Sequence, residues 1–177
     1  MKIAIIGSGA MGCLYGAYLS KKNKVIMVDV VDKVVDTICE KGITIKENDG
    51  SEHHYKENIT AYHSGKCHEK VDLIIMFVKS TYLEDALEQN KDLFHDDTIV
   101  MSLQNGAGND RKIEKYVKKE NIIIGTSKHN ARSEGCAIVC HTGHGETTIG
   151  SNYDAKDILE KVETILKDCS FDTVVSD

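Results

Sequence analysis

The sequence predicts an α/β fold in which an open parallel sheet carries helices on both faces. Three observations predict it. Short runs of apolar residues are bounded by glycines or polar residues, as buried strands are. Segments with the spacing of an amphipathic helix separate these runs. Strand-like and helix-like segments then alternate along the 177 residues, which favours parallel strands joined by helical crossovers.

The first elements have the plainest patterns. The run KIAII at 2–6 ends in glycine and indicates a strand buried on both faces. A helix is expected over 10–22, with apolar residues on or near one stripe, and KVIMVDV at 24–30 is a second strand. Further along we expect a helix at 32–41 that ends at Gly42, a strand and turn at 43–52, a buried strand at 72–78, a helix at 82–90, a strand at 98–103, a helix near 108–119, a strand at 121–125, two β-like runs within 136–149, a helix near 155–168 and a strand at 171–177.

Composition and charge are those of an ordinary soluble globular chain, and the length predicts a single domain. The net charge is −6 and the Lys and Arg residues are scattered, which disfavours nucleic acid and anionic membrane as partners. Apolar runs stay well short of the ~20 residues of a membrane span, and the N-terminus begins with a strand rather than a signal peptide. Six irregularly spaced cysteines are expected to be free thiols in a reducing, cytoplasmic environment.

A glycine-rich turn joins the first predicted strand to the first helix. The sequence GSGAMG at 7–12 has the strand–turn–helix context that a dinucleotide-binding fingerprint requires. The first glycine permits the tight turn, the second leaves room for a pyrophosphate, and the third lets the helix pack closely on the sheet. The N–H groups and dipole of the first helical turn then hold the phosphate charge. The alternative is a glycine-rich turn without a ligand. We predict a Rossmann-type dinucleotide site at Gly7, Ser8, Gly9, Ala10, Met11 and Gly12.

An acidic residue, Asp29, ends the second predicted strand. Its carboxylate can accept hydrogen bonds from the hydroxyls of the adenosine ribose. A site for NADP(H) would instead need an arginine for the 2′-phosphate, and Lys33 is the nearby cation. A phosphate charge ~4 Å from the carboxylate would cost up to ~4 kcal/mol. Asp29 therefore favours NAD(H), with NADP(H) as the alternative; a helix N-cap or a solvated loop acid is the other interpretation of this residue.

Two polar residues follow the next buried strands. Lys79 comes directly after the strand at 72–78, and Asn105 follows the strand at 98–103. In open α/β sheets, ligands lie outside the carboxyl ends of the strands. Both side chains are therefore expected near the nicotinamide half of the cofactor, where Gly106 and Gly108 would let the backbone pass closely. The alternatives are a plain Asn-Gly turn and a surface lysine.

Together with further motifs, these residues resemble the ketopantoate reductase (2-dehydropantoate 2-reductase) family over nearly the whole chain. The resemblance rests on IGSGAMG, VK followed by Tyr82, QNGAGN, GTSKHNARSEG at 125–135 and HTGHGETTIG at 141–150. It implies NAD(P)H-dependent reduction of a 2-keto acid on the pathway to pantothenate and coenzyme A. It also implies cofactor contacts at residues 7–12, Lys79, Asn105 and the backbone near Ala131, with Asn105 touching the substrate as well.

The sequence departs from the family pattern in three ways. Members that use NADPH usually carry a basic residue just past the second strand, where this chain has Asp29 and two valines, and the residue after QNG is often larger than Ala107. The resemblance also implies a proton-donating lysine in an all-α C-terminal domain that begins soon after a strand like that at 171–177. We therefore expect residues 1–177 to be the cofactor-binding domain alone, with the C-terminal domain and its catalytic residues absent from this chain.

Other candidate groups for chemistry are weaker. Lys79, Lys128 and His129 are the candidates for an acid within the chain, and none is favoured. Zinc is suggested superficially by a C-x3-C-H-x2-H pattern. Its second cysteine and first histidine are neighbours on a predicted strand and point to opposite faces, which favours small buried thiols and polar histidines over a metal site. The pattern consists of Cys136, Cys140, His141 and His144.

Two further functions are compatible with the glycine motif. One is another Rossmann dehydrogenase of 2- or 3-hydroxyacids, which differs in the acid that it reduces. The other is a non-catalytic NAD-binding regulatory module, which does not account for Lys79 and Asn105 at the ends of strands. A homodimer is left open by the sequence.

Overall fold

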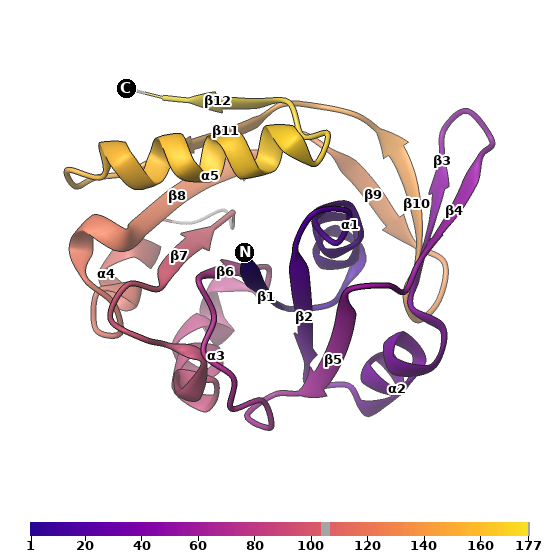
Figure 1. Ribbon diagram of the computed structural model, residues 1–177, viewed down its shortest axis with the longest axis horizontal. Coiled ribbons are helices and arrows are strands. Elements are labelled where there is room, and N and C mark those ends of the chain that lie inside the picture. Colours follow the sequence, from indigo (N-terminus) through magenta and orange to yellow (C-terminus); the bar gives the residue numbers. More distant parts are fainter. Residues whose placement is uncertain (104–106, 177) are drawn as a thin grey trace.

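The computed structural model describes residues 1–103 and 107–176 and contains two sheets. Among these residues the larger sheet has eight strands, in the order β12-β11-β8-β7-β6-β1-β2-β5 (Figure 1). Its strands are β1 Lys2–Ile6, β2 Lys24–Asp29, β5 Ile59–His63, β6 Leu73–Met76, β7 Ile99–Ser102, β8 Ile122–Ser127, β11 Thr147–Gly150 and β12 Thr173–Val175.

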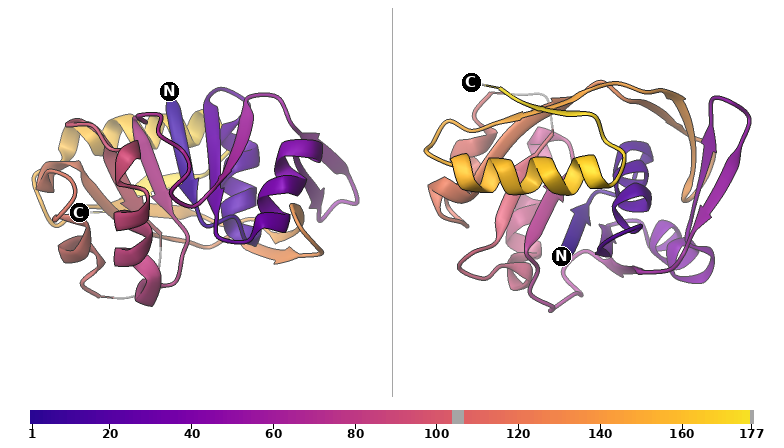
Figure 2. Two further views of the ribbon diagram at one scale, coloured as in Figure 1. Left: turned by 90° about the horizontal axis from the view of Figure 1, so that it is seen from below. Right: turned by 45° about the horizontal axis from the view of Figure 1, so that its top comes forward.

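Helices cover both faces of the larger sheet, as predicted. Along β1, Ile3 and Ile5 pack toward one face, with α1 and α5, while Ala4 and Ile6 pack toward the other, with α3 and α4. Figure 2 shows α5 and α3 on opposite sides of the strands. The helices are α1 Ala10–Leu19, α2 Asp32–Lys41, α3 Leu83–Gln89, α4 Asn109–Ile113 and α5 Lys156–Asp168.

One strand pair departs from the predicted parallel sheet. β11 runs antiparallel to β8, whereas the other neighbouring pairs of the larger sheet are parallel. The reversal occurs because β8 leads into β9 and β10 of a second sheet before the chain returns as β11, so that no helix crosses over between β8 and β11 in this described segment.

The second sheet was predicted only in part. In the described residues it has four strands in the order β4-β3-β10-β9, namely β4 Glu52–Tyr55, β3 Ile43–Glu47, β10 Ile138–Gly143 and β9 Asn130–Ser133. β3 and β10 are parallel although their sequences are far apart. Figure 1 shows this sheet beside α1, which it contacts through β3, β9 and β10. The second sheet therefore encloses α1 against the larger one.

Two helical predictions were too long. The helix expected over 10–22 ends at Leu19, and the helix expected near 108–119 is the single turn of α4, followed later by a 3-10 turn at Lys119–Asn121. Within α4, Asn109 and Ile113 are the buried residues, so little of the segment beyond Ile113 gains core contacts as a helix. Within the described residues, the structure has no helix long and apolar enough to cross a membrane.

Candidate functional site

Two of the three glycines in the turn from β1 to α1, Gly7 and Gly12, could not be replaced by a larger residue without movement of the backbone. Gly7 has a φ of +101°, and a Cβ at this position would lie 2.9 Å from the carbonyl carbon of Phe77. A Cβ on Gly12 would lie 1.9 Å from the Gly7 oxygen. Gly9 precedes the helix with an ordinary φ of −76°, and no described atom lies within 4 Å of a Cβ there. The space beside Gly9 is therefore open, while Gly7 and Gly12 are fixed by packing.

Asp29 holds this turn to the end of β2. Its Oδ2 accepts a hydrogen bond from the Ser8 N–H at 2.7 Å, and its Oδ1 accepts one from the Val31 N–H at 2.9 Å. The Ser8 hydroxyl donates to the Val28 carbonyl at 3.1 Å. Val31, rather than Asp29, is the N-cap residue of α2. The structure thus places the half-buried carboxylate between the glycine turn and the start of α2.

A cavity of about 410 Å³ joins several of the predicted residues. Gly7, Gly9 and Asp29 contribute to its wall, and Lys79 reaches it from the segment after β6. Its rim is apolar: Val30 is 65% exposed and Tyr82 is 60% exposed, which is unusual for such side chains. The sequence identified the glycines, the acid and the lysine, but it gave no reason to expect an apolar rim between them.

The structure does not bring every predicted residue to this cavity. Ala131 lies on β9, in the second sheet, where it pairs with His141 of β10. Asn105, with its neighbours Gln104 and Gly106, lies outside the described residues. Ala107 and Gly108 line a separate cavity of about 540 Å³ at the ends of β7 and β8.

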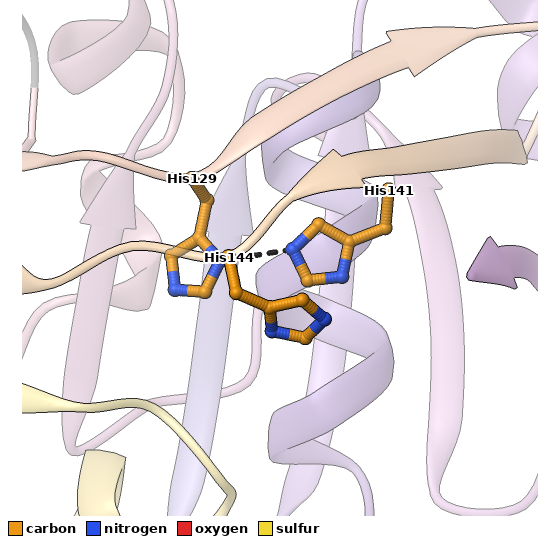
Figure 3. Close-up of side chains that lie close together, drawn as sticks. All are labelled: His129, His141 and His144. Atoms are coloured by element: carbon orange, nitrogen blue, oxygen red, sulfur yellow. Dashed lines mark hydrogen bonds between the residues drawn. The ribbon is translucent and has the colours of Figure 1, made fainter. Parts of the chain in front are cut away.

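A buried polar cluster lies on the other side of α1. His129, His141 and His144 are close together (Figure 3), and Glu47 of β3 accepts a hydrogen bond from the His141 Nδ1–H at 2.9 Å. Burial lowers the pKa of His129 to about 4, with the neighbouring histidines acting in the same direction. Burial opposes the charge of Glu47, but hydrogen bonds from Tyr18 and His141 lower its pKa below the usual value.

The zinc pattern considered from the sequence is not the group that the structure assembles. His141 and His144 belong to both, but the third member is His129 from the segment before β9. Cys140 lies instead beside Glu134, which raises the pKa of its thiol. Cys140 and His141 do face opposite sides of β10, since His141 is fully buried and Cys140 is not. Spacing along the chain could not indicate His129, because it is the pairing of β9 with β10 as a hairpin that brings His129 beside His141.

Comparison with known proteins places these features in a family. Residues 3–167 match the family model described as ketopantoate reductase PanE/ApbA. The 2-dehydropantoate 2-reductase of Lactococcus lactis is 40% identical over 138 residues, which are 76% of this chain and 43% of that protein. That of Pyrococcus abyssi is 32% identical over 180 residues, covering 100% of this chain and 57% of its own length.

Solved structures give the same result for the fold. A putative 2-dehydropantoate 2-reductase from Enterococcus faecalis has a TM-score of 0.93 at 30% identity, covering 100% of this chain and 57% of that one. A D-mandelate dehydrogenase with NADH and anilino(oxo)acetate has a TM-score of 0.93 at 35% identity, with the same coverage of 100% and 57%. The chain therefore spans about half the length of the relatives that it matches.

Proposed function

Since the chain belongs to the ketopantoate reductase (PanE/ApbA) family, we propose that it is the dinucleotide-binding part of an NAD(P)H-dependent reductase that converts 2-dehydropantoate to pantoate. In this reaction a hydride passes from the nicotinamide to the keto carbon, and an acid protonates the oxygen as alkoxide charge develops. The observation that carries the proposal is the hydrogen bond from Ser8 to Asp29 beside the open space at Gly9.

The proposed position of the pyrophosphate is the open side of Gly9. The cap residue of α1 is Gly9, which has no side chain to accept a hydrogen bond from the start of the helix. The first N–H groups of a helix have no partner inside the helix. These groups and the helix dipole favour an anion. A larger residue at position 9 would occupy the same space. The residues that we propose to bind the cofactor here are Gly7, Ser8, Gly9, Ala10, Met11 and Gly12.

The adenosine half of the cofactor is proposed to lie over the apolar rim. Asp29 would accept hydrogen bonds from the ribose hydroxyls, because its Oδ1 and Oδ2 each retain accepting capacity beyond the backbone N–H that they hold. Val30 and Tyr82 offer apolar surface at the same cavity, which suits a flat aromatic base.

The nicotinamide half is proposed to extend toward Lys79, Asn105 and the backbone near Ala131. Lys79 is exposed and lines the cavity. For Ala131 the support is the packing of β9 against α1, together with the family resemblance. For Asn105, as a contact of both cofactor and substrate, the support is its place after the strand at 98–103 together with the family resemblance. Six free thiols, which a reducing compartment would preserve, support a cytoplasmic location.

We propose NADH as the preferred cofactor, because a 2′-phosphate would approach the Asp29 carboxylate. Repulsion of about 2 kcal/mol, half the value at ~4 Å, would already give more than a tenfold preference. The structure of a D-mandelate dehydrogenase with NADH, a protein that is 35% identical to this chain, supports this choice. A nearby group, His63, acts against the preference for NADH. It pairs with Asp29 across β2 and β5, and the His63 Nδ1 lies 2.7 Å from the Asp32 carboxylate.

A second candidate substrate is an aromatic 2-keto acid. The D-mandelate dehydrogenase is 35% identical to this chain, and the Enterococcus faecalis 2-dehydropantoate 2-reductase is 30% identical, at the same TM-score of 0.93. Measuring kcat/KM for 2-dehydropantoate and for phenylglyoxylate in the whole enzyme distinguishes the two candidate substrates. A higher kcat/KM for phenylglyoxylate would favour the second candidate.

The cofactor proposal is tested by isothermal titration of the chain with NADH and with NADPH at low salt, where charge effects are least screened. We expect NADH to bind at least about tenfold more tightly. Asp29→Asn keeps the shape, removes the charge and gives up one of the two backbone hydrogen bonds, so it should shift the ratio toward NADPH even if both affinities fall. Asp36→Asn makes the same charge change on an exposed position of α2 and should leave the ratio unchanged.

The outcomes distinguish a failure of the proposed function from a failure of the cofactor preference alone. Absence of binding by either cofactor up to millimolar concentration would refute the proposed function itself. Equal affinity for both, unchanged by Asp29→Asn, would refute only the preference and would assign the 2′-phosphate to Lys33 or His63.

A further inference from the structure

Three histidines from separate segments meet beneath α1. His129 lies between β8 and β9, His141 is on β10, and His144 lies between β10 and β11. One ring nitrogen of each lies within 4.8 Å of the others. Figure 3 shows the rings turned toward a common region, with His129 and His141 joined by a hydrogen bond. Two of the three are buried: His129 is 7% exposed and His141 is 0% exposed.

The hydrogen bonds around His141 fix which of its nitrogens is available. Glu47 is acceptor-only as a carboxylate, so the Nδ1 of His141, 2.9 Å from Glu47 Oε2, carries the proton. Tyr18 donates to the other oxygen of Glu47 and holds that carboxylate in place. The Nε2 of neutral His141 therefore presents a lone pair toward His129. A carboxylate behind a histidine in this way is the usual outer partner of a metal-bound imidazole.

The same reasoning leaves one of the two ring nitrogens of His129 without a hydrogen bond among the described residues. Its Nδ1 lies 2.9 Å from His141 Nε2 and must donate, since the latter has no proton. Its Nε2 is then a buried lone pair with no hydrogen-bond partner among the described residues. An unpaired buried polar atom costs about 1–3 kcal/mol. A closed structural network of hydrogen bonds therefore does not account for this cluster.

The surroundings favour neutral imidazoles, the form that binds metal. Tyr15 and Phe171 contact His129 edge-on, with ring centroids 6.2 and 5.5 Å away. His144, by contrast, has a side chain that is 60% exposed, and it lines a cavity with Tyr18 and Glu47 that is open to solvent. An ion could reach the cluster from this side.

We propose that His129, His141 and His144 bind one divalent transition-metal ion, zinc being the first choice, with Glu47 orienting His141. Nitrogen atoms bound to zinc at ~2.0–2.1 Å in a tetrahedron lie about 3.3 Å apart. His129 Nδ1 and His141 Nε2 are 2.9 Å apart, so a small separation of the rings would admit the ion in place of their hydrogen bond, with the Nδ1 proton of His129 moving to its unpaired Nε2. Imidazole ligands suit zinc, copper and nickel, whereas magnesium and calcium prefer oxygen.

Such an ion would connect the two sheets. His129 follows β8 of the larger sheet directly, while His141 and Glu47 belong to paired strands of the second sheet. The bound ion would fix the segment before β9 to this pair, and would raise the thermal stability of the chain, because it binds the folded state.

The test uses the 177-residue chain, first treated with a chelator and then titrated with Zn²⁺ in the absence of nucleotide. We expect one equivalent to bind and the Tm to rise. Co²⁺ at the same site should give the visible absorption bands of a tetrahedral ion. His144→Ala, at an exposed position that folding does not require, should weaken binding at least about tenfold. His53→Ala is the matched control, because His53 is an exposed histidine lining the same cavity outside the cluster.

A second variant keeps all three ligands. Glu47→Gln removes the carboxylate behind His141 and should weaken Zn²⁺ binding by about 10–100-fold. The proposal is overturned if no stoichiometric binding occurs, if His144→Ala and His53→Ala weaken it equally, or if Zn²⁺ leaves the Tm unchanged.

Discussion

The glycines at the start of α1 provide a direct test of which part of the turn serves folding and which serves the ligand. Adding one methyl group at each of three positions meets three different surroundings. At Gly9 no described atom lies within 4 Å of the new Cβ, whereas at Gly12 the Gly7 carbonyl oxygen is 1.9 Å away. At Gly16 the nearest atom is the sulfur of Met27, at 2.4 Å.

The expected stability changes follow from what must move. In Gly12→Ala the methyl needs about 1.4 Å more room to reach the ~3.3 Å of an ordinary C···O contact, and the obstacle is backbone. Overpacking of this kind costs about 1–3 kcal/mol or more, against a gain of up to ~1 kcal/mol from helix propensity. We expect a loss of about 2 kcal/mol in the free energy of unfolding.

The other two substitutions should be mild for folding. In Gly16→Ala the obstacle is a flexible thioether, which can rotate away, so the propensity gain offsets most of the strain. In Gly9→Ala the backbone, at φ −76° and ψ −162°, suits alanine, and the poorer N-cap roughly balances the entropy gain in the unfolded chain. Both variants should lie within about 1 kcal/mol of the parent chain.

Urea unfolding followed by circular dichroism, together with NADH titration, separates these effects. Gly9→Ala should fold normally and lose most of its NADH affinity, Gly16→Ala should change little in either assay, and Gly12→Ala should lose stability and affinity together. The reasoning about the phosphate position is refuted if Gly9→Ala binds NADH like the parent. The reasoning about packing is refuted if Gly12→Ala is as stable as Gly16→Ala.

Two further predictions concern thiol chemistry and turnover. Burial raises the pKa of Cys13 to about 12, with Asp29 acting in the same direction, so at about pH 8 iodoacetamide should modify the exposed Cys39 and spare Cys13 until the chain unfolds. The unfolded chain releases that proton at a pKa of about 9.0, so the contribution of Cys13 to stability should be lost as the pH rises from there toward 12. Equal labelling of Cys13 and Cys39 in the folded chain, read by peptide mass spectrometry, would contradict the labelling prediction. We also expect the 177-residue chain to bind NADH without reducing 2-dehydropantoate, because the family resemblance assigns the proton donor to a C-terminal helical domain, and sustained loss of NADH absorbance with this substrate would count against that assignment.

The sequence predicted the strands that are apolar throughout and also segments that include β3, β10, β11 and β12, but it missed β4, β5 and β9. β1, β2, β6 and β7 are buried almost end to end, so each appears as an uninterrupted apolar run. β5 has one buried residue, Ala61, and pairs with β2 at the edge of the sheet. β4 and β9 are polar edge strands of the second sheet. Edge strands need little apolar surface, so local patterning gives them no signal.

The candidate site residues likewise fall into those that local sequence indicates and those that it does not. The glycine turn, Asp29 and Lys79 could be predicted as candidates because each stands directly at the end of an apolar run, and the structure brings them to one cavity. The histidine cluster could not, because His141 meets Glu47 through the parallel pairing of β3 with β10, and no local pattern specifies that pairing. Contacts made by register between distant strands are fixed by the whole fold rather than by nearby sequence.

Helix α1 explains why the sequence indicated the glycine turn but not the histidine cluster. Gly12 through Leu19 are all buried, so the helix has no solvent face that could produce the single apolar stripe expected from periodicity. Gly12 and Gly16 face Ile5 and Met27 of the larger sheet, where an added methyl group would meet backbone at Gly12 and the movable Met27 thioether at Gly16. On other sides, the hydroxyl of Tyr15 bonds to Ser127 and Thr147, and that of Tyr18 bonds to Glu47.

Each of these buried hydroxyls needs a partner, which β8 and β11 of the larger sheet supply for Tyr15 and the second sheet supplies for Tyr18. The same ten-residue helix therefore presents open backbone N–H groups to the candidate dinucleotide site and tyrosine hydroxyls to partners on both sheets. The glycines of the first role recur at fixed spacing and are recognised as a motif. The tyrosines of the second role resemble ordinary core residues until their partners are known.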